Sequence, residues 1–233
     1  YLAGFMLAFA LLWLVAFEPP TEDAFISMRC ARNLCEGHGL VFNPGQRVEA
    51  MSNLLWTLLL AALGCVLDNY LIASQLLGFI FSALSLVFIL VLAWRADMRP
   101  KAIILAGALL VLSPYFLTFT VYGLESPLQI LLLLGLLWGI AEGRWTAAGL
   151  ALGLLPAVRP EGYFFIPPVL LLIFLWERRK IKWLHFLTPL LVLTAAVLLF
   201  RFIYYGELLP NTVYSKSIAL VPELDVCLGK IGR

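Results

Sequence analysis

The chain has little charge. Of its 233 residues only 13% are Asp, Glu, Lys or Arg, whereas 63% are hydrophobic. A soluble domain carries about 25% charged and roughly 45–50% apolar residues. This deficit excludes an ordinary soluble domain, and the mean hydropathy of +0.98 places most of the chain in lipid. The net charge of +2 says little about partners, because the placement of charge matters more than its sum. We expect membrane lipids around the chain and no nucleic acid.

Cysteine and histidine are also scarce. The four cysteines fit neither a zinc-ligand spacing nor a redox motif, and nothing in their pattern suggests a disulfide framework. Cys30 and Cys35 would face different ways on one helix, so we expect ordinary thiols. His38 lies between two glycines, where a turn residue is the usual role. We therefore assign no metal ligand to it, and the sequence leaves open whether a divalent cation binds elsewhere.

Long hydrophobic runs dominate instead. Because a helix needs about 20 apolar residues to span a bilayer, the run Leu54–Leu67 is too short and better fits an interfacial or re-entrant helix. The fold class predicted is all-α, a polytopic transmembrane helix bundle. The hydrophobic runs are Leu2–Phe17, Leu54–Leu67, Leu71–Trp94, Ala102–Val121, Pro127–Ala141, Trp145–Ala157, Tyr163–Trp176 and Trp183–Ile203.

Basic loops predict the topology. Short loops rich in Lys and Arg stay in the cytoplasm, and three such loops lie near residues 95–101, 144 and 178–182. All three fall on one side if Leu54–Leu67 does not cross and the other runs make seven spans. A first loop at 18–69 then faces the extracytoplasmic side, together with residues 122–127, 158–162 and the tail from Tyr204.

The chain begins at Tyr1 and ends at Arg233 with no terminating feature. We expect residues 1–233 to form a single transmembrane module that is the N-terminal part of a longer protein. Leu2–Phe17 lacks a basic leader and a cleavage site, so we expect a retained helix and not a signal peptide.

Two adjacent carboxylates, Glu22 and Asp23, open the first loop. At a membrane surface such a pair can supply a general base or bind a cation that holds a phosphate. The alternative is an ordinary helix start, with Thr21 as the cap and acids in the first turn. Both roles are compatible.

Arg29, Arg32 and Asn33 follow at helical spacing. Arg32 can pair with Glu36 at i,i+4, which is a structural role. Arg29 has no such local partner, so a carboxylate or a phosphate is its candidate ligand. All three are candidate substrate contacts.

Residues 39–50 predict a short hairpin, because Pro44-Gly45 suits the centre of a type II turn. Glu49 and Asn53 lie where the chain returns to the membrane boundary. We expect them to be weak candidates for sugar contacts.

Arg159 and Glu161 flank Pro160 between two hydrophobic runs. Charged residues within membrane segments face a cavity or pair with each other, so Arg159 could bind a lipid phosphate or simply pair with Glu161. Glu125, near the start of another run, is a weaker candidate because an acid at a helix N-terminus is ordinary.

The tail from Tyr204 to Lys216 is dense in aromatic and hydrogen-bonding groups. Tyr205 and Asn211 could contact a sugar, and Lys216 could contact a phosphate. The alternative is an aromatic belt followed by a solvated loop.

Six motifs appear in order along the chain: EDAFISxR at 22–29, NLxEGHGLVFN at 33–43, NxLWT at 53–57, YGLE at 122–125, RPEG at 159–162 and YGxLLPNT at 205–212. This series resembles the terminal arabinofuranosyltransferase-like family of bacterial membrane proteins. The resemblance implies a C-fold (GT-C) glycosyltransferase with a polyprenyl-phosphate sugar donor. It also implies the bacterial inner membrane, with the active side extracytoplasmic.

The family's acidic pair in the first loop falls on Glu22 and Asp23, and Glu22 departs from the usual second aspartate. We therefore predict transfer of a pentofuranose or hexose from a lipid-linked donor to a cell-envelope glycan, lipid or protein acceptor. Asp23 or Glu22 would be the base, and Arg159 and Lys216 would stabilise the departing phosphate. Alternatives are a carrier or flippase, which would place its site near the membrane midplane, and a non-catalytic scaffold.

Overall fold

The computed structural model describes residues 2–15, 20–176 and 181–213, and every structural statement below refers to them. Helices account for all the regular structure in these residues, so the all-α prediction is confirmed. The helices are α1 (Leu2–Val15), α2 (Glu22–Cys35), α3 (Leu54–Leu67), α4 (Tyr70–Arg95), α5 (Pro100–Val111), α6 (Pro114–Val121), α7 (Ser126–Ala141), α8 (Trp145–Val158), the 3₁₀ helix η1 (Pro160–Phe165), α9 (Ile166–Trp176) and α10 (Trp183–Tyr205).

Local signals in the sequence account for some of the helix ends. Asn69 caps α4, because its side chain accepts a hydrogen bond from the backbone N of Ile72 at 3.0 Å. Pro114 divides the run Ala102–Val121 into α5 and α6, which meet at a bend of 51°. Proline has no backbone N–H and clashes with the preceding turn, so a straight helix cannot continue through it.

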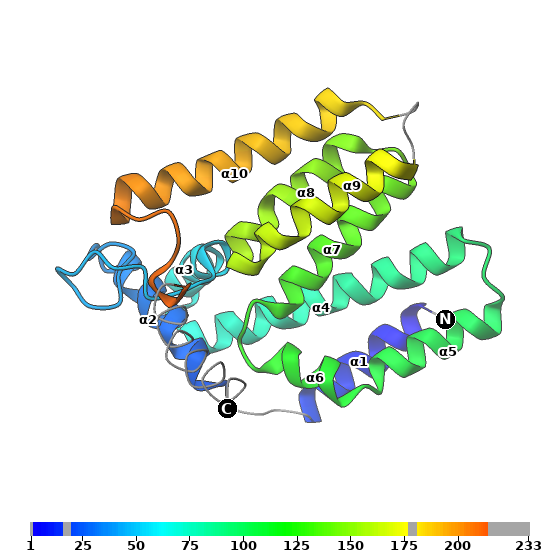
Figure 1. Cartoon of the computed structure of the whole chain (residues 1–233). Helices are drawn as coiled ribbons and strands as arrows, with labels where there is room; N and C mark the ends of the chain where they lie inside the picture. The colour runs from blue at the N-terminus through cyan, green and yellow to red at the C-terminus, as the bar shows by residue number, and fades with distance from the viewer. Residues whose placement is uncertain (1, 16–19, 177–180, 214–233) are drawn as a thin grey trace, which may run out of the picture.

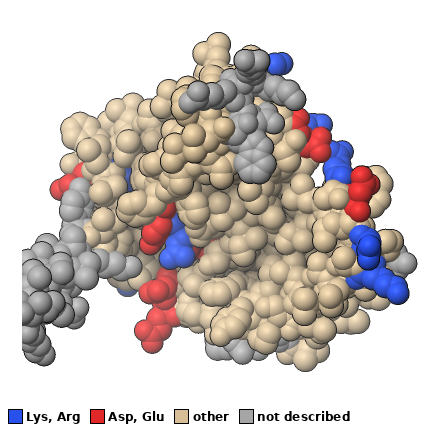
Figure 2. All heavy atoms as spheres, turned by 45° about the vertical axis from the view of Figure 1, so that its right-hand side comes forward, with Lys and Arg blue, Asp and Glu red and all other residues tan. Residues whose placement is uncertain are grey.

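The helices lie as a bundle with two distinct ends (Figure 1). One end, here called the loop end, holds α2, α3, the junctions α6–α7 and α8–η1, and the end of α10. The opposite, basic end holds the junctions α4–α5 and α7–α8. On the side shown in Figure 2, charged side chains gather in separate groups with a broad uncharged surface between them. The polar motifs of the sequence therefore share one end of the molecule.

The number of membrane spans differs from the simple count of hydrophobic runs. Among the described residues, α4 and α10 are long and apolar enough to cross a membrane, and the bent pair α5–α6 would be a third. The other apolar helices are shorter, α3 included. Length and composition do not confirm seven spans, so that number stays a prediction.

Small residues let α8 pack closely against its neighbours. A Cβ built on Gly149 would lie 2.1 Å from the backbone O of Phe186 in α10. Gly139 in α7 is also restricted, because its Cβ would lie 2.8 Å from the backbone N of Ala148. Helices without side chains at the contact approach closely, as is common between helices in membranes. This packing brings the end of α10 to the loop end.

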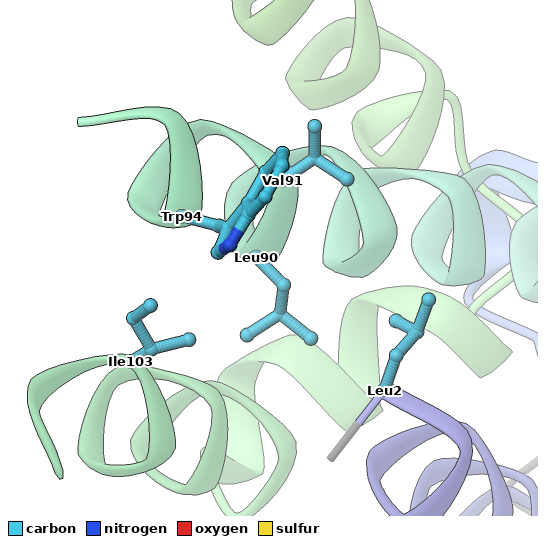
Figure 3. Close-up of a pocket in the computed structure, with 5 residues that line it drawn as sticks. All are labelled: Leu2, Leu90, Val91, Trp94 and Ile103. Carbon is cyan, nitrogen blue, oxygen red and sulfur yellow. The ribbon is translucent and has the colours of Figure 1, made fainter. Parts of the chain in front are cut away.

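An apolar pocket of about 240 Å³ lies between α1, α4 and α5. Figure 3 shows its lining, which consists of Leu2, Leu90, Val91, Trp94 and Ile103. Aliphatic and aromatic side chains supply no acid, base or nucleophile. The polar and charged groups that could perform chemistry lie instead at the loop end.

Candidate active site at the loop end

Glu22 and Asp23 occupy the first turn of α2 and are exposed. Their charges suit the positive end of the helix dipole. Thr21 holds the N-cap position with extended backbone, but its hydroxyl makes no cap bond and is buried without a hydrogen-bond partner among the described residues. Neither carboxylate pairs with another side chain in the described part of the chain, so both can reach a ligand.

The start of α2 lies beside the segment that precedes α7. The backbone N of Thr21 donates to the carbonyl of Tyr122 at 3.3 Å. Gly123 packs directly on this helix, because its Cβ would lie 3.4 Å from that of Ala24. Its φ of +74° is also a conformation that glycine adopts without strain. The acidic pair and the YGLE motif are therefore neighbours.

Asn53 joins three elements with one buried side chain. Its Nδ2 donates to Glu125 Oε2 at 2.7 Å, and its Oδ1 accepts from Ser27 Oγ at 2.9 Å and Thr57 Oγ1 at 3.0 Å. Asn53 precedes α3 and Glu125 precedes α7. The network fixes these two helix starts against α2.

Glu125 also holds Arg159. Its Oε1 lies 3.2 Å from Arg159 Nε, while Glu161 lies farther away at 3.7 Å. The predicted Arg159–Glu161 pair is present, but the buried Glu125 is the closer partner. Because the Arg159 side chain is 39% exposed, the guanidinium is anchored on one side and open to a ligand on another. We expected less of Glu125 from the sequence, since an acid near a helix start is commonplace.

Glu49 pairs with a residue that the sequence analysis missed. Arg201 in α10 is fully buried, and its Nε donates to both carboxylate oxygens of Glu49 at 3.0 and 3.1 Å. Burial raises the pKa of Glu49, and the charge and hydrogen bond of Arg201 oppose that shift. The signal was in the sequence, because an arginine within an apolar run needs a partner.

Arg29 and Arg32 contact aromatic rings. The Arg29 guanidinium lies 4.3 Å from the ring centre of Phe42 and donates to Asn43 Oδ1 at 3.2 Å. Arg32 lies 5.6 Å from the Tyr70 ring. The expected pair of Arg32 with Glu36 is not among the ion pairs of the described residues. Both arginines stay exposed, so they can still reach a ligand.

Asn33 has a structural contact. It is buried, and its Nδ2 donates to the carbonyls of Val41 and Phe42 at 2.8 and 3.0 Å. The amide thereby anchors the loop that follows α2. Its role as a substrate contact stays a prediction.

The turn at Pro44-Gly45 forms as predicted. Gln46 N donates to Asn43 O at 3.1 Å, and Gly45 has a φ of +85°. The flanking segments make no strand pairing in the described residues 39–50, so the expected hairpin is wrong. Side chains of α2 and α10 hold this loop instead of a ladder.

The tail is fastened to the loop by its tyrosines. Tyr205 Oη donates to Leu40 O at 2.6 Å, and Tyr204 Oη accepts from Leu40 N at 3.0 Å. Asn211 donates its backbone N–H to Glu49 O at 3.3 Å, while its side chain is exposed. Lys216 lies outside the described residues.

Cys35 and Cys65 form a disulfide between α2 and α3. The expectation of ordinary thiols is therefore wrong for these two, because packing brings together cysteines that are 30 residues apart. Cys30 is free and buried, and burial raises the pKa of its thiol to about 11. Cys227 lies outside the described residues.

The described residues contain no group of three or more His, Cys, Asp and Glu that could hold a metal ion. Glu22 and Asp23 are adjacent carboxylates, which are oxygen ligands of the kind that Mg²⁺ and Ca²⁺ prefer. A cation held there would need further ligands from a substrate phosphate or water.

The described helices are mostly apolar, and the loop end of the bundle carries carboxylates, arginines and a disulfide. These features define a helical membrane protein with a candidate active site at the loop end. Two relatives match most of the chain, and both are named terminal β-(1→2)-arabinofuranosyltransferase. The protein of Mycobacterium tuberculosis is 32% identical over 232 residues, which is 85% of this chain and 35% of the relative. The protein of Corynebacterium glutamicum is 32% identical over 228 residues, which is 84% of this chain and 33% of the relative.

The chain thus spans about a third of the length of these relatives. No family model and no solved structure matches it. The two matches confirm the resemblance to the terminal arabinofuranosyltransferase-like family over the shared region.

Proposed function

We propose that this chain is the catalytic membrane portion of a C-fold glycosyltransferase that moves a pentofuranose from a polyprenyl-phosphate donor to an extracytoplasmic glycan. The observation that carries the proposal is the network Asn53–Glu125–Arg159 beside the exposed pair Glu22–Asp23. This network places an accessible carboxylate and a partly exposed, ion-paired guanidinium at the same end of the bundle. The names of the two relatives support the reaction and the sugar.

The chemistry follows from these two groups. Asp23, or Glu22 beside it, removes the proton from an acceptor hydroxyl as the oxygen bonds to the anomeric carbon. The bond between that carbon and the phosphate oxygen breaks, and the leaving phosphate takes the electron pair. Arg159 stabilises the charge that develops there, which lowers the barrier because the interaction strengthens in the transition state.

Glu125 and Asn53 position Arg159 in this mechanism. Glu125 is buried, and Asn53 donates to its Oε2, which orients the carboxylate whose Oε1 forms the ion pair with Arg159. A fixed donor needs no reorganisation when charge develops. Glu161 lies on the exposed side of Arg159, where a phosphate oxygen could replace it.

The proposal includes seven passes with the loop end outside. Disulfides persist in oxidising compartments, which supports an extracytoplasmic position for Cys35–Cys65. Arg95 and Arg144 lie at the opposite end, in agreement with cytoplasmic basic loops. In Figure 1, α3 is seen nearly end-on, whereas α4 and α10 run across the picture and are seen from the side; α3 therefore points in another direction, which fits an interfacial helix.

The decisive experiment is sugar transfer in membranes that contain the full-length parent protein, with a radiolabelled polyprenyl-phosphate pentofuranose. The variants are Asp23→Asn and, as a matched control at the basic end, Asp97→Asn. Asp97 is exposed with a φ of +51°, which asparagine tolerates well. Loss of transfer in Asp23→Asn alone supports the proposal. Transfer that survives in Asp23→Asn moves the base to Glu22, and absent transfer in the wild type with every donor favours a carrier or scaffold.

A further inference from the structure

A second pocket, which has polar residues in its lining and a volume of about 340 Å³, lies at the end of α10. Two segments far apart in sequence form it, residues 47–49 of the first loop and residues 205–211 of the tail. Binding sites for small molecules have volumes of about 300–1,000 Å³. Since one water occupies about 30 Å³ of liquid, the pocket has room for a sugar ring.

Contacts within the protein form the pocket without a ligand. Gly206 ends α10 with a φ of +82° and turns the chain back toward the first loop. The bond from Asn211 N to Glu49 O joins the two walls, and the Tyr205 hydroxyl is fixed on Leu40 O. The walls therefore keep their spacing without a ligand.

The buried residue Glu49 forms part of the lining. Glu49 is 3% exposed and accepts from Arg201 Nε through both oxygens. Arg201 does not line the pocket, so it acts on a ligand only by positioning Glu49. Because both Glu49 oxygens are occupied by Arg201, Glu49 fixes the wall of the pocket, and the exposed polar side chains of Glu207 and Asn211 are the groups that can contact a ligand.

The charges of the lining select the ligand. The charge of Glu49 is balanced by Arg201, and the lining adds one further carboxylate, Glu207, and one guanidinium, Arg47. A phosphate would therefore meet no excess of positive charge, whereas a neutral polyol would find acceptors at the Glu207 carboxylate and both kinds of group at the Asn211 amide. The Tyr205 ring adds an aromatic surface. Carboxylate, amide and tyrosine together suit a carbohydrate.

We propose that this pocket binds a neutral sugar unit of the acceptor glycan, as a subsite separate from the Asp23 and Arg159 groups. Glu49 lines the pocket and Asn53 holds Glu125, so one short segment connects the subsite to the network that positions Arg159. The assignment of this sugar to the acceptor rests on the proposed function, whereas the binding of a sugar in the pocket does not.

The test measures binding of a synthetic arabinofuranosyl tetrasaccharide to the purified full-length parent protein in nanodiscs, by calorimetry and without donor. The double variant Glu207→Ala/Asn211→Ala removes two exposed polar side chains and keeps the backbone bond from residue 211 to Glu49. Glu142→Gln at the basic end is the matched control. Thermal unfolding of each variant verifies the fold.

A net hydrogen bond contributes about 0.5–1.5 kcal/mol, so we expect Kd to rise roughly tenfold or more in the double variant and to stay unchanged in Glu142→Gln. A tetrasaccharide with the same Kd in the double variant and the wild type overturns the subsite. Decyl phosphate that competes with the tetrasaccharide in the wild type but not in the double variant also overturns it, because the pocket would then be an anion site.

The subsite and the proposed function can fail separately. Asp23→Asn should lose transfer and still bind the tetrasaccharide with the wild-type Kd. Pocket-dependent binding in a wild type that transfers no sugar would retain the subsite and reject the glycosyltransferase. Transfer with an unchanged acceptor KM in the double variant would reject the subsite and retain the glycosyltransferase.

Discussion

Arg201 donates from Nε to both carboxylate oxygens of Glu49 at 3.0 and 3.1 Å, although 152 residues separate the two. Both side chains are buried, and the arginine belongs to an otherwise apolar helix. The pair fastens the last described helix to the first loop. It thereby connects the fold to the pocket that Glu49 lines.

Removal of Arg201 should destabilise the protein strongly, because Glu49 would be left buried and unpaired. Breaking a buried ion pair on one side costs about 3–5 kcal/mol. We expect Arg201→Met to lower the melting temperature of the purified protein markedly. The double variant Glu49→Gln/Arg201→Met should recover much of the loss, and a double variant as unstable as Arg201→Met would contradict this account.

The stability should depend on the pH through Glu49. Burial raises the pKa of this carboxyl above its ordinary value of 4.5. An acid with a raised pKa in the folded state contributes stability below the unfolded pKa and loses it as the pH rises through the folded pKa. We therefore expect the wild type to lose stability relative to Glu49→Gln as the pH rises above about 4.5. Thermal unfolding of both proteins from pH 4 to 7 measures the difference, and a relative gain by the wild type would reject the raised pKa.

Arg159→Ala should reduce kcat far more than it changes the donor KM. Loss of one preorganised donor to a developing charge costs about 10²–10³ in kcat. Arg159→Lys should keep part of the rate, because the charge remains while the planar fork is lost. Steady-state transfer kinetics provide the measurement, with Arg144→Ala at the basic end as the control. An unchanged kcat in Arg159→Ala would remove this residue from the mechanism.

The disulfide should stabilise the contact between α2 and α3. A link that closes 30 residues is worth about 3–4 kcal/mol in the chain-entropy estimate. The variant Cys35→Ser/Cys65→Ser should melt at a lower temperature than the wild type. Cys30 should stay unlabelled by maleimide in the oxidised protein, because it is buried and its pKa is about 11. Labelling of Cys35 or Cys65 in the wild type without reductant would show that the bond is absent.

Gly149→Ala should disturb the packing of α8 on α10, since the new Cβ would overlap the backbone O of Phe186. Gly4→Ala in α1 is the matched control, because nothing lies within 4 Å of its Cβ. Alanine is favoured over glycine within a helix by roughly 0.5–1 kcal/mol. We expect Gly149→Ala to lower the melting temperature and Gly4→Ala to cause no decrease. Equal decreases in the two variants would contradict the close contact.

The sequence predicted the helices well and the contacts poorly. Leu54–Leu67 and Trp145–Ala157 became helices almost as expected, because a long apolar run in lipid has to satisfy its backbone internally. The hairpin at 39–50 failed, because Asn33 and Tyr205 satisfy backbone groups of that loop. A local pattern does not show which distant side chains will do so.

The sequence by itself determined the helical class, the collection of polar motifs at one end and the acidic pair at the start of α2. These follow from hydropathy, charge and helix-end signals, which act over short stretches of chain. Only the tertiary structure decided that Glu125 holds Arg159, that Arg201 holds Glu49 and that Cys35 joins Cys65. The physical reason is that a buried charge takes whichever partner the packing of helices brings within reach, and close packing at residues such as Gly149 sets that position.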